Sequence, residues 1–556
     1  MGEGGEVRRH GGRAGHRCDC GAELAGGAGQ VVVGEETVAQ GRGDLLGGRA
    51  EVGGGVGALR PAAPVRRGGG GNSSGLRGGL RPARARRCPG VTPAGDEAVT
   101  DSGGSELQGH EQCVHRVGCV MTTSPANPRE VSDGDSDAPG QRGLSSCPLI
   151  FDPQCPKLPE DVLGGLREQA PVVRITLPGG LPAWMITRFD DVRAGLGDPR
   201  LVQSPLSVPG FTGEDPRMAQ IRWLGLPERM NQYLLRALLD LDAADHTRLR
   251  KAVAPHFTAR RIHALRPRVE QITDRLLSEL PGRAAADGSV DFIEEVAFPL
   301  SITVICEMVG VPEQDRPLWR RWADDLNGLD TDLVRDSAPA LVDHVLALIE
   351  ERRRTPGDDL ISAMVTPSPD GEPPLPERDI VTMTMLVTNV GYENTAYFLA
   401  NGLAALLAHP DQLDLLRDDP ALLPSAVTEL LRWGGSVPAT RPRFAAQDID
   451  LHGTRIRVGE AVVLSLLGAN RDRRYHPDAD RFDITRYQDA QDDHVALGHG
   501  AHFCLGAALV RLETQVLLGA LTARFPGLRL AVAPDRLERV HVPGVGRRLT
   551  RLPLHL

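Results

Sequence analysis

The sequence predicts a mainly α-helical fold with small β-sheets. Segments of helical period follow one another from about residue 259 to residue 353, and short runs of alternating apolar residues lie before and after them. A further segment, which starts at Val381, stays apolar nearly all round for about seven helical turns. A helix of this kind is expected to be buried through the centre of a domain.

The elements can be placed in order along the chain. PVVRITL and PAWMITR, joined by turn residues at 178–180, alternate as a strand pair does. A loop-rich stretch over 201–235 comes next. Helices are then expected over about 259–280, 292–309, 316–326 and 333–353, ahead of the central helix. A strand with a turn at Asp448 is expected after Arg443.

The first 120 residues differ from the rest of the chain. They are rich in Gly, Arg and Ala without apolar periodicity, so they cannot build a core. We expect residues 1–120 to be a disordered extension, or to be read from upstream of a true start at Met121. A polar leader over 121–145 and one domain over 146–556 would follow. The cysteines near the N-terminus, spaced C-x-C and C-x5-C, fit no standard zinc motif.

The composition argues against several classes of partner. The chain carries 63 Lys and Arg against 73 Asp and Glu, a formal net charge of −10, with no basic cluster in the predicted domain. We therefore expect neither nucleic acid nor a membrane as partner. No apolar stretch reaches the roughly 18 residues of a membrane helix, and no signal peptide is recognisable. These features predict a cytoplasmic protein.

The most informative stretch is LGHGAHFCLGAALVRLE, residues 497–513, where a cysteine among glycines leads directly into a helix. Backbone N–H groups at the start of that helix point back toward Cys504, and with the positive helix end they favour a thiolate. Gly498, Gly500 and Gly506 remove side chains where a large, flat group must approach the backbone. A thiolate in open space can ligate iron, whereas a lone free cysteine is more often a small buried hydrophobe.

The whole run resembles the haem-binding signature of the cytochrome P-450 superfamily, F-G-x-G-x-H/R-x-C-x-G. Only Leu497 departs, where the family usually has Phe. The resemblance implies the cytochrome P-450 fold, a triangular helical haem-thiolate domain. It also implies haem b (iron protoporphyrin IX) as the cofactor, with Cys504 as the axial ligand of the haem iron and Gly498 and Gly506 beside the cofactor.

A second constellation lies in SAVTELLRW, where Glu429 and Arg432 are three residues apart on one helix face. Alone, such a pair is usually a surface salt bridge. Together with Arg481 in YHPDADRFDITR it resembles the family's Glu-Arg-Arg triad, which ties a helix to the loop below the haem. Ala479 replaces the usual Pro in that loop. The resemblance makes these residues structural, not catalytic.

The carboxylates of a buried cofactor need cations. His246 and Arg250 are four residues apart on a predicted helix, and Arg443 precedes a predicted strand. By the resemblance, His246, Arg250, Arg443 and His502 bind the two haem propionates, Arg through its planar fork and His through a ring N–H. Each of them taken singly would be a solvated surface group, and Arg441 is a weaker candidate for the same role.

The central helix carries the implied catalytic group. Gly391 and Glu393 resemble the family's A/G-G-x-D/E-T stretch beside the bound oxygen. Glu393 takes the place of the acid, Asn394 stands where the family usually has Thr, and Thr395 follows. The resemblance therefore implies Glu393, Asn394 and Thr395 as catalytic residues, with the acid present and the usual alcohol replaced by an amide.

Asn394 leaves three outcomes open, because an amide can donate and accept hydrogen bonds but has no labile hydroxyl proton. Asn394 orders a water, or a hydroxyl of the substrate completes the proton relay, or oxygen activation is weak and the site does something else. Two neighbouring polar residues, Thr388 and Asn389, have a structural explanation, since their side chains can bond back to helix carbonyls.

The resemblance implies a monooxygenase that uses O2 and electrons from a separate ferredoxin or flavodoxin with its NAD(P)H reductase. That partner would dock near Cys504, where arginines such as Arg511 are expected on the surface. The stretch over 201–235, as a lid, and the helix after it are similar to family members that oxidise macrolides and other polyketides. We therefore expect a small hydrophobic substrate, hydroxylated or epoxidised, held by the lid, residues 385–394, the GGSVPAT stretch and a loop near 543–545.

Two alternatives of other classes stay open. A haem-thiolate enzyme that couples, rearranges or dehydrates its substrate without inserting oxygen would also tolerate Asn394. A catalytically silent haem scaffold that recruits a partner is the non-enzyme alternative, against which the presence of Glu393 argues.

Overall fold

The computed structural model describes residues 159–177, 180–215, 217–328, 330–367, 371–489, 493–542 and 546–556. The predicted extension over 1–120, the predicted leader over 121–145 and the loop at 543–545 lie outside these residues, as do most of the turn at 178–180 and the cysteines near the N-terminus. Within the described residues the fold is mainly helical with small sheets, as the sequence predicts.

The α-helices of the described residues are, in chain order, α1 (Pro159–Gln169), α2 (Phe189–Gly197), α3 (Arg217–Leu224), α4 (Asn231–Leu234), α5 (Ala243–Val253), α6 (Ala259–Ala264), α7 (Arg266–Glu279), α8 (Phe298–Val309), α9 (Arg316–Asn327), α10 (Thr331–Arg354), α11 (Leu360–Val365), α12 (Glu377–Leu407), α13 (Pro410–Asp418), α14 (Leu423–Gly434), α15 (Leu466–Asn470) and α16 (Ala507–Arg524). A π-helical turn over Ile293–Ala297 leads directly into α8.

The strands are β1 (Val172–Thr176), β2 (Pro182–Ile186), β3 (Leu201–Val202), β4 (Val290–Asp291), β5 (Arg443–Ala445), β6 (Ile449–Leu451), β7 (Thr454–Ile456), β8 (Ala461–Leu464), β9 (Arg529–Leu530), β10 (Arg539–Val542), β11 (Gly546–Leu549) and β12 (Pro553–His555). Among the described residues they form a five-stranded sheet of order β1-β2-β8-β5-β3, a three-stranded sheet of order β4-β12-β9, and the pairs β6-β7 and β10-β11.

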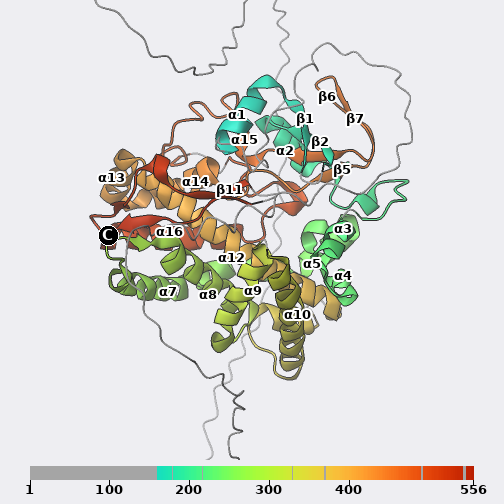
Figure 1. Ribbon diagram of the computed structural model, residues 1–556, viewed down its shortest axis with the longest axis horizontal. Helices are drawn as coiled ribbons and strands as arrows, with labels where there is room; N and C mark the ends of the chain where they lie inside the picture. Colours follow the sequence, from blue (N-terminus) through green and yellow to red (C-terminus); the bar gives the residue numbers. More distant parts are fainter. Residues whose placement is uncertain are drawn as a thin grey trace, which may run out of the picture. The chain divides into compact units, whose positions relative to one another are not determined.

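The five-stranded sheet contains the predicted strand pair. β1 and β2 are antiparallel, with Val172 opposite Ile186, and β2 also pairs in parallel with β8, where Ala183 lies opposite Ala461. β5 begins at Arg443 and pairs antiparallel with β8. Figure 1 shows these strands close to α1, α2 and α15. The sheet therefore holds the backbone of Arg443 in a fixed register.

The helices predicted before the central helix are confirmed, with one break that the sequence analysis does not foresee. The helix expected over 259–280 is divided at Leu265 into α6 and α7. Pro267 lies in the first turn of α7, where its missing N–H costs no hydrogen bond, so it starts a helix readily. α8 ends at Gly310, whose φ of +102° suits glycine. α10 begins after Asp330, whose carboxylate accepts hydrogen bonds from two N–H groups of the first turn.

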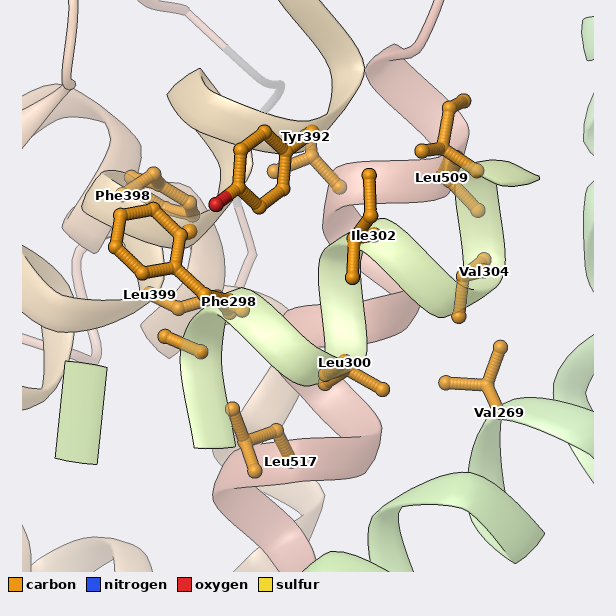
Figure 2. Close-up of a cluster of buried hydrophobic side chains, with 14 of the residues drawn as sticks. Val269, Phe298, Leu300, Ile302, Val304, Tyr392, Phe398, Leu399, Leu509 and Leu517 are labelled. Atoms are coloured by element: carbon orange, nitrogen blue, oxygen red, sulfur yellow. The ribbon is translucent and has the colours of Figure 1, made fainter. Parts of the chain in front are cut away.

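α12 is the central helix that the apolar segment predicts, and it runs without interruption over all 31 of its residues. It packs along α8 and also against α10, α14 and α16. A Cβ on Gly391 would lie 3.0 Å from the Ile305 side chain, so glycine is what lets α8 approach α12 at this level. Figure 2 shows the buried side chains where four helices meet: Val269 from α7; Phe298, Leu300, Ile302 and Val304 from α8; Tyr392, Phe398 and Leu399 from α12; Leu509 and Leu517 from α16.

The loop-rich stretch over 201–235 contains β3, α3 and α4. A cluster of charges joins it to the segment that follows α14. Arg217 pairs with Asp215 at 2.5 Å and with Asp240 at 2.6 Å, and Arg441 reaches the same Asp240 at 2.8 Å. Both aspartates are buried, which favours ion pairs that hold their geometry. In the part of the chain that the structure describes, no helix combines the length and apolar character needed to cross a membrane.

Candidate functional site

The loop before α16 presents Cys504. The Cys504 N–H donates to the Leu497 carbonyl at 2.8 Å, which closes the loop, and α16 begins three residues later at Ala507. Gly498 and Gly500 have φ of +76° and +71°, values that favour glycine. A Cβ on Gly500 would also lie 3.1 Å from the Gly197 backbone of α2. The glycines therefore allow both the turn and its close approach to a neighbouring helix.

The sequence predicts that the start of α16 favours a thiolate at Cys504, and the structure shows effects on the pKa of this thiol in both directions. The Gly506 N–H donates to the sulfur and, together with the Arg250 and Arg511 guanidinium groups, acts to lower the pKa of the Cys504 thiol. Burial has the larger effect and raises that pKa. A cation that binds at Sγ would stabilise the thiolate form of Cys504.

The four predicted propionate ligands converge beside Cys504. The rings of His246 (α5) and His502 lie 4.1 Å apart between centroids. Arg250, one turn further along α5, donates from Nη2 to the Phe503 carbonyl at 2.6 Å. Arg443 in β5 donates from Nη1 to two carbonyls at the end of α2, at 3.0 and 3.2 Å. Four cation-forming side chains from distant parts of the chain therefore share one site.

The carboxylates that act on this set of four groups, those of Asp242 and Asp198, attract its members only through space, and Asp198 pairs with Arg200. Desolvation lowers the pKa of His246 and of Arg250, lowers the pKa of Arg443 to about 10 and lowers that of His502 to about 4. Asp242 opposes the shift at three of them, but its carboxylate already accepts hydrogen bonds from two backbone N–H groups and a serine hydroxyl at the start of the lid. The site is therefore suited to a ligand that carries negative charge.

Unpartnered atoms support the same conclusion. His246 Nε2 and Arg443 Nε are buried and have no hydrogen-bond partner. Such atoms are costly to leave unpaired, which points to a ligand that supplies acceptors. Two apolar side chains in the predicted site segments are exposed: Phe503, which precedes Cys504, is 41% exposed, and Val390, three residues before Glu393 on α12, is 39% exposed. Haem b, a flat apolar ring with two carboxylates, fits a sulfur ligand, hydrogen-bond donors from Arg and His side chains, and exposed apolar surface.

The structure corrects one member of the predicted Glu-Arg-Arg triad. Glu429 and Arg432 are fully buried, and Arg432 donates to both carboxylate oxygens at 2.7 and 2.8 Å. The Arg481 side chain is 67% exposed and lies 3.7 Å from Asp483. The third cation is Arg486, whose Nε lies 3.2 Å from the Glu429 carboxylate.

The path of the loop explains why Arg486, not Arg481, faces Glu429. The backbone carbonyls of this loop point inward, so that Arg432 donates to the Ala479 and Arg481 carbonyls at 2.8 and 3.3 Å. Arg486 donates to the Pro477, Asp478 and Arg481 carbonyls as well, which places its guanidinium inside the same turn. Arg481 thus contributes its carbonyl to the cluster while its side chain turns outward.

The predicted catalytic residues lie side by side on α12. Glu393, Asn394 and Thr395 are all partly buried. Glu393 forms an ion pair with Arg548 of β11, and a second nitrogen of the same guanidinium lies 3.5 Å from Asn394 Oδ1. Burial raises the pKa of Glu393, and the charge of Arg548 opposes that rise.

The back-bonding expected for two polar residues of α12 does not occur. Asn389 instead exchanges two side-chain hydrogen bonds with Asn327, at 2.8 and 3.2 Å, at the end of α9. Thr388 Oγ1 is buried and has no hydrogen-bond partner. The polar residues of the central helix are thus not explained by the helix alone.

Arg548 and Asn327 are site residues that the sequence analysis misses. Each lies in an element remote in sequence from residues 389–394, and neither stands in a motif. The sequence near the C-terminus contains Arg547, Arg548 and Arg551, and nothing in it indicates which arginine turns inward. β11, which pairs with β10, packs beside α12, and this packing brings Arg548 to Glu393.

Comparison with known proteins shows the family. The Cytochrome P450 family profile matches residues 316–534. Cytochrome P450 107B1 of Saccharopolyspora erythraea is 42% identical over 392 residues, which cover 70% of this chain and 93% of that protein. The 6-deoxyerythronolide B hydroxylase of the same organism is 39% identical over 374 residues, covering 66% and 89%. A solved structure of the Bacillus subtilis bacillaene polyketide synthase cytochrome P450 PksS has a TM-score of 0.64 at 33% identity, covering 71% of this chain and 96% of that one.

The chain therefore belongs to the cytochrome P450 family. It is an oxidoreductase, a monooxygenase related to bacterial macrolide and polyketide hydroxylases, and its family implies haem b as the cofactor.

Proposed function

We propose that the protein hydroxylates or epoxidises a small hydrophobic natural product, a polyketide or macrolide intermediate, with electrons from a separate ferredoxin or flavodoxin and its NAD(P)H reductase. The observation that carries the proposal is the site itself, in which Cys504 lies among four unpaired cation-forming side chains with an acid and an amide on the central helix. Relatives named as a 6-deoxyerythronolide B hydroxylase and as a polyketide synthase cytochrome P450 support the substrate class. A cytoplasmic location stays a prediction.

The residues around Cys504 would hold the cofactor. Cys504 is the proposed axial ligand of the haem iron, and His246, Arg250, Arg443 and His502 are the proposed propionate ligands. Gly498 and Gly506 leave the space that a ring beside the sulfur requires. Haem b, when bound, supplies the chemistry that activates O2 and inserts one of its oxygen atoms into the substrate.

Glu393, Asn394 and Thr395 are proposed to manage protons and water. Burial raises the pKa of the Glu393 carboxyl, so this group takes up a proton more readily than an exposed carboxyl does and can pass it on, as a general acid must. Asn394 can orient a water through its amide, and Thr395 offers the nearest hydroxyl along the helix.

The redox partner is proposed to dock on the face that carries Cys504. Arg511 lies on this side but is engaged within the protein, since it donates to Thr428 Oγ1 at 3.2 Å and lies 3.3 Å from His494 Nε2. Its proposed contribution is therefore the positive charge near the sulfur, where an acidic partner would be favoured.

A non-oxygenating reaction is the second candidate, because Asn394 has no hydroxyl to pass a proton. Turnover under ¹⁸O2 with polyketide substrates, a surrogate ferredoxin and its reductase separates the two. We expect one ¹⁸O atom in each product molecule. Products formed without ¹⁸O would contradict oxygen insertion and favour coupling, rearrangement or dehydration.

A further inference from the structure

Arg548 reaches the central helix from the last β-hairpin of the chain. Its side chain is only 6% exposed. One nitrogen pairs with Glu393, another lies 3.5 Å from Asn394 Oδ1, and the guanidinium carbon lies 4.4 Å from the centre of the Tyr397 ring. A single cation therefore lies against three residues of α12, Glu393, Asn394 and Tyr397, around the proposed catalytic group.

These contacts restrict both catalytic side chains. The Glu393 carboxylate is half of a buried ion pair, which favours its charged form against the effect of burial. The Asn394 amide turns its oxygen toward the guanidinium, because a cation attracts the acceptor end of an amide and repels the donor end. The Nδ2 donor of Asn394 is thereby left for a partner other than Arg548.

Arg548 also lines a cavity. It has a volume of about 250 Å³ and is lined by Tyr397, Asn401, Arg471 and Arg548 among others. Asn401 Oδ1 is buried and has no hydrogen-bond partner in the structure. A cavity of this volume has room for water, and the unpartnered Asn401 Oδ1 offers such a water an acceptor. Arg548 therefore lines this cavity and also contacts Glu393.

We propose that Arg548 is a positioning residue that holds Glu393 charged, fixes the amide of Asn394, and so sets the pH range over which Glu393 exchanges protons with water in the cavity. The inference rests on the proton-handling role proposed for Glu393. Arg548 supplies a fixed partner for the side chains of Glu393 and Asn394. It thereby takes over part of the ordering of these side chains that a hydroxyl at position 394 would provide.

Other charged and titratable groups lie near Glu393 and contribute to its electrostatic surroundings. Asp324 of α9 acts to raise the pKa of Glu393, and Arg320 of the same helix lies 3.6 Å from Asp324. Tyr392 of α12 donates to Asp324 at 2.6 Å, and burial raises the pKa of Tyr397. Arg548 is the cation in direct contact with Glu393 among these groups, so its removal leaves burial and Asp324 unopposed.

The test compares thermal unfolding of the haem-loaded full chain across pH for the native protein, Arg548→Met, Glu393→Gln and the double variant. A carboxyl whose folded-state pKa is raised contributes most stability when protonated at low pH, and this stability is lost as pH rises through the folded-state pKa. Loss of Arg548 raises the Glu393 pKa further, because burial and Asp324 then act unopposed, so the pH window of this stability loss extends upward. We expect the stability deficit of Arg548→Met to grow as pH rises above the folded-state pKa that Glu393 has in the native protein, and to be independent of pH in the Glu393→Gln background.

Matched variants separate positioning from packing. Arg548→Lys retains the charge and is expected to restore most of the pH dependence, and Arg548→Gln replaces the Met variant if that one does not fold. Arg551→Met removes a cation from the same terminal segment that pairs with Asp291 instead, and is expected to show no deficit that depends on Glu393. A deficit of Arg548→Met that is equal at all pH values, or unchanged by Glu393→Gln, overturns the proposal.

Turnover separates this inference from the proposed function. If Glu393 handles protons, Arg548→Met shifts the pH optimum of product formation upward, in the direction of the stability window. If Glu393→Gln leaves turnover unchanged while the stability coupling persists, the proton-handling role fails, whereas the ion pair stands. An unshifted pH optimum together with a strongly impaired Glu393→Gln overturns the role of Arg548 alone.

Discussion

Asn394 is the residue at which this chain departs most from the pattern that Gly391 and Glu393 otherwise follow. Its amide keeps hydrogen-bonding capacity but gives up a labile proton, and its oxygen lies toward Arg548. The acid beside it is paired with the same arginine. Asn394, which departs from the pattern, and the acid beside it therefore share one partner, Arg548.

The variant Asn394→Thr tests how the missing hydroxyl affects oxygen activation. A hydroxyl at position 394 adds a proton path, so we expect the share of reducing equivalents recovered in product, instead of hydrogen peroxide, to rise several-fold. The gain should stay below the roughly 100-fold that a well-placed proton donor contributes, because the amide is proposed to order water already. Parallel assays of product and peroxide measure it, and a fall in coupling would show that the amide is required as it stands.

The four cation-forming residues show how far residue patterns carry a prediction. His246, Arg250, Arg443 and His502 are predicted from the sequence, and the structure brings them together. Their lowered pKa values and unpartnered atoms come from burial without an anion, which no sequence pattern reports. The spacing of residues in the sequence can indicate a set of ligands. The packing of the folded protein decides whether the charges of these residues are paired with opposite charges.

At the scale of elements, the loop after α15 decides which arginine completes the cluster on α14. The sequence favours Arg481, because it stands in the place that the family motif would assign to the triad. The loop turns its carbonyls inward, and Arg486, five residues later, enters the turn instead. A motif specifies residue types and order, whereas the direction of a side chain in an irregular loop depends on local backbone hydrogen bonds.

A matched pair of variants tests this correction. Arg486→Met removes a largely buried cation beside Glu429 and is expected to lower the free energy of unfolding by about 1.5–3 kcal/mol. Arg481→Met changes an exposed side chain and is expected to stay within about 0.5 kcal/mol. Urea unfolding monitored by helix circular dichroism compares the two. Equal losses, or a larger loss for Arg481→Met, would restore the original triad.

The hairpin β10-β11 is the element that no sequence signal connects to the site. Its residue Arg548 is separated from Glu393 by 155 positions, and contacts of such separation follow only from the whole fold. The long helix α12, by contrast, is predicted correctly, because the apolar residues on nearly all of its sides lie in one continuous segment of the sequence. Continuous patterns predict elements well, and contacts between distant elements are what the structure adds.

At the scale of the whole molecule, one helix serves both the core and the chemistry. α12 buries apolar side chains against α8 and α16, and the same helix presents Glu393 and Asn394. Gly391 keeps α8 close beside this turn, so the position of the acid is set by core packing. Binding of a cofactor between such elements stabilises the folded state in addition, since ligand affinity for the native protein adds to its stability.

If Cys504 ligates a haem iron, the carbon-monoxide difference spectrum of the dithionite-reduced protein depends on this residue. Cys306→Ala is the matched control, because Cys306 is the other free cysteine of the described residues and is buried in α8. We predict a red-shifted Soret band in the native protein and in Cys306→Ala, and its loss in Cys504→Ala. A protein that binds no haem, or a Cys504→Ala spectrum identical to the native one, would contradict the account.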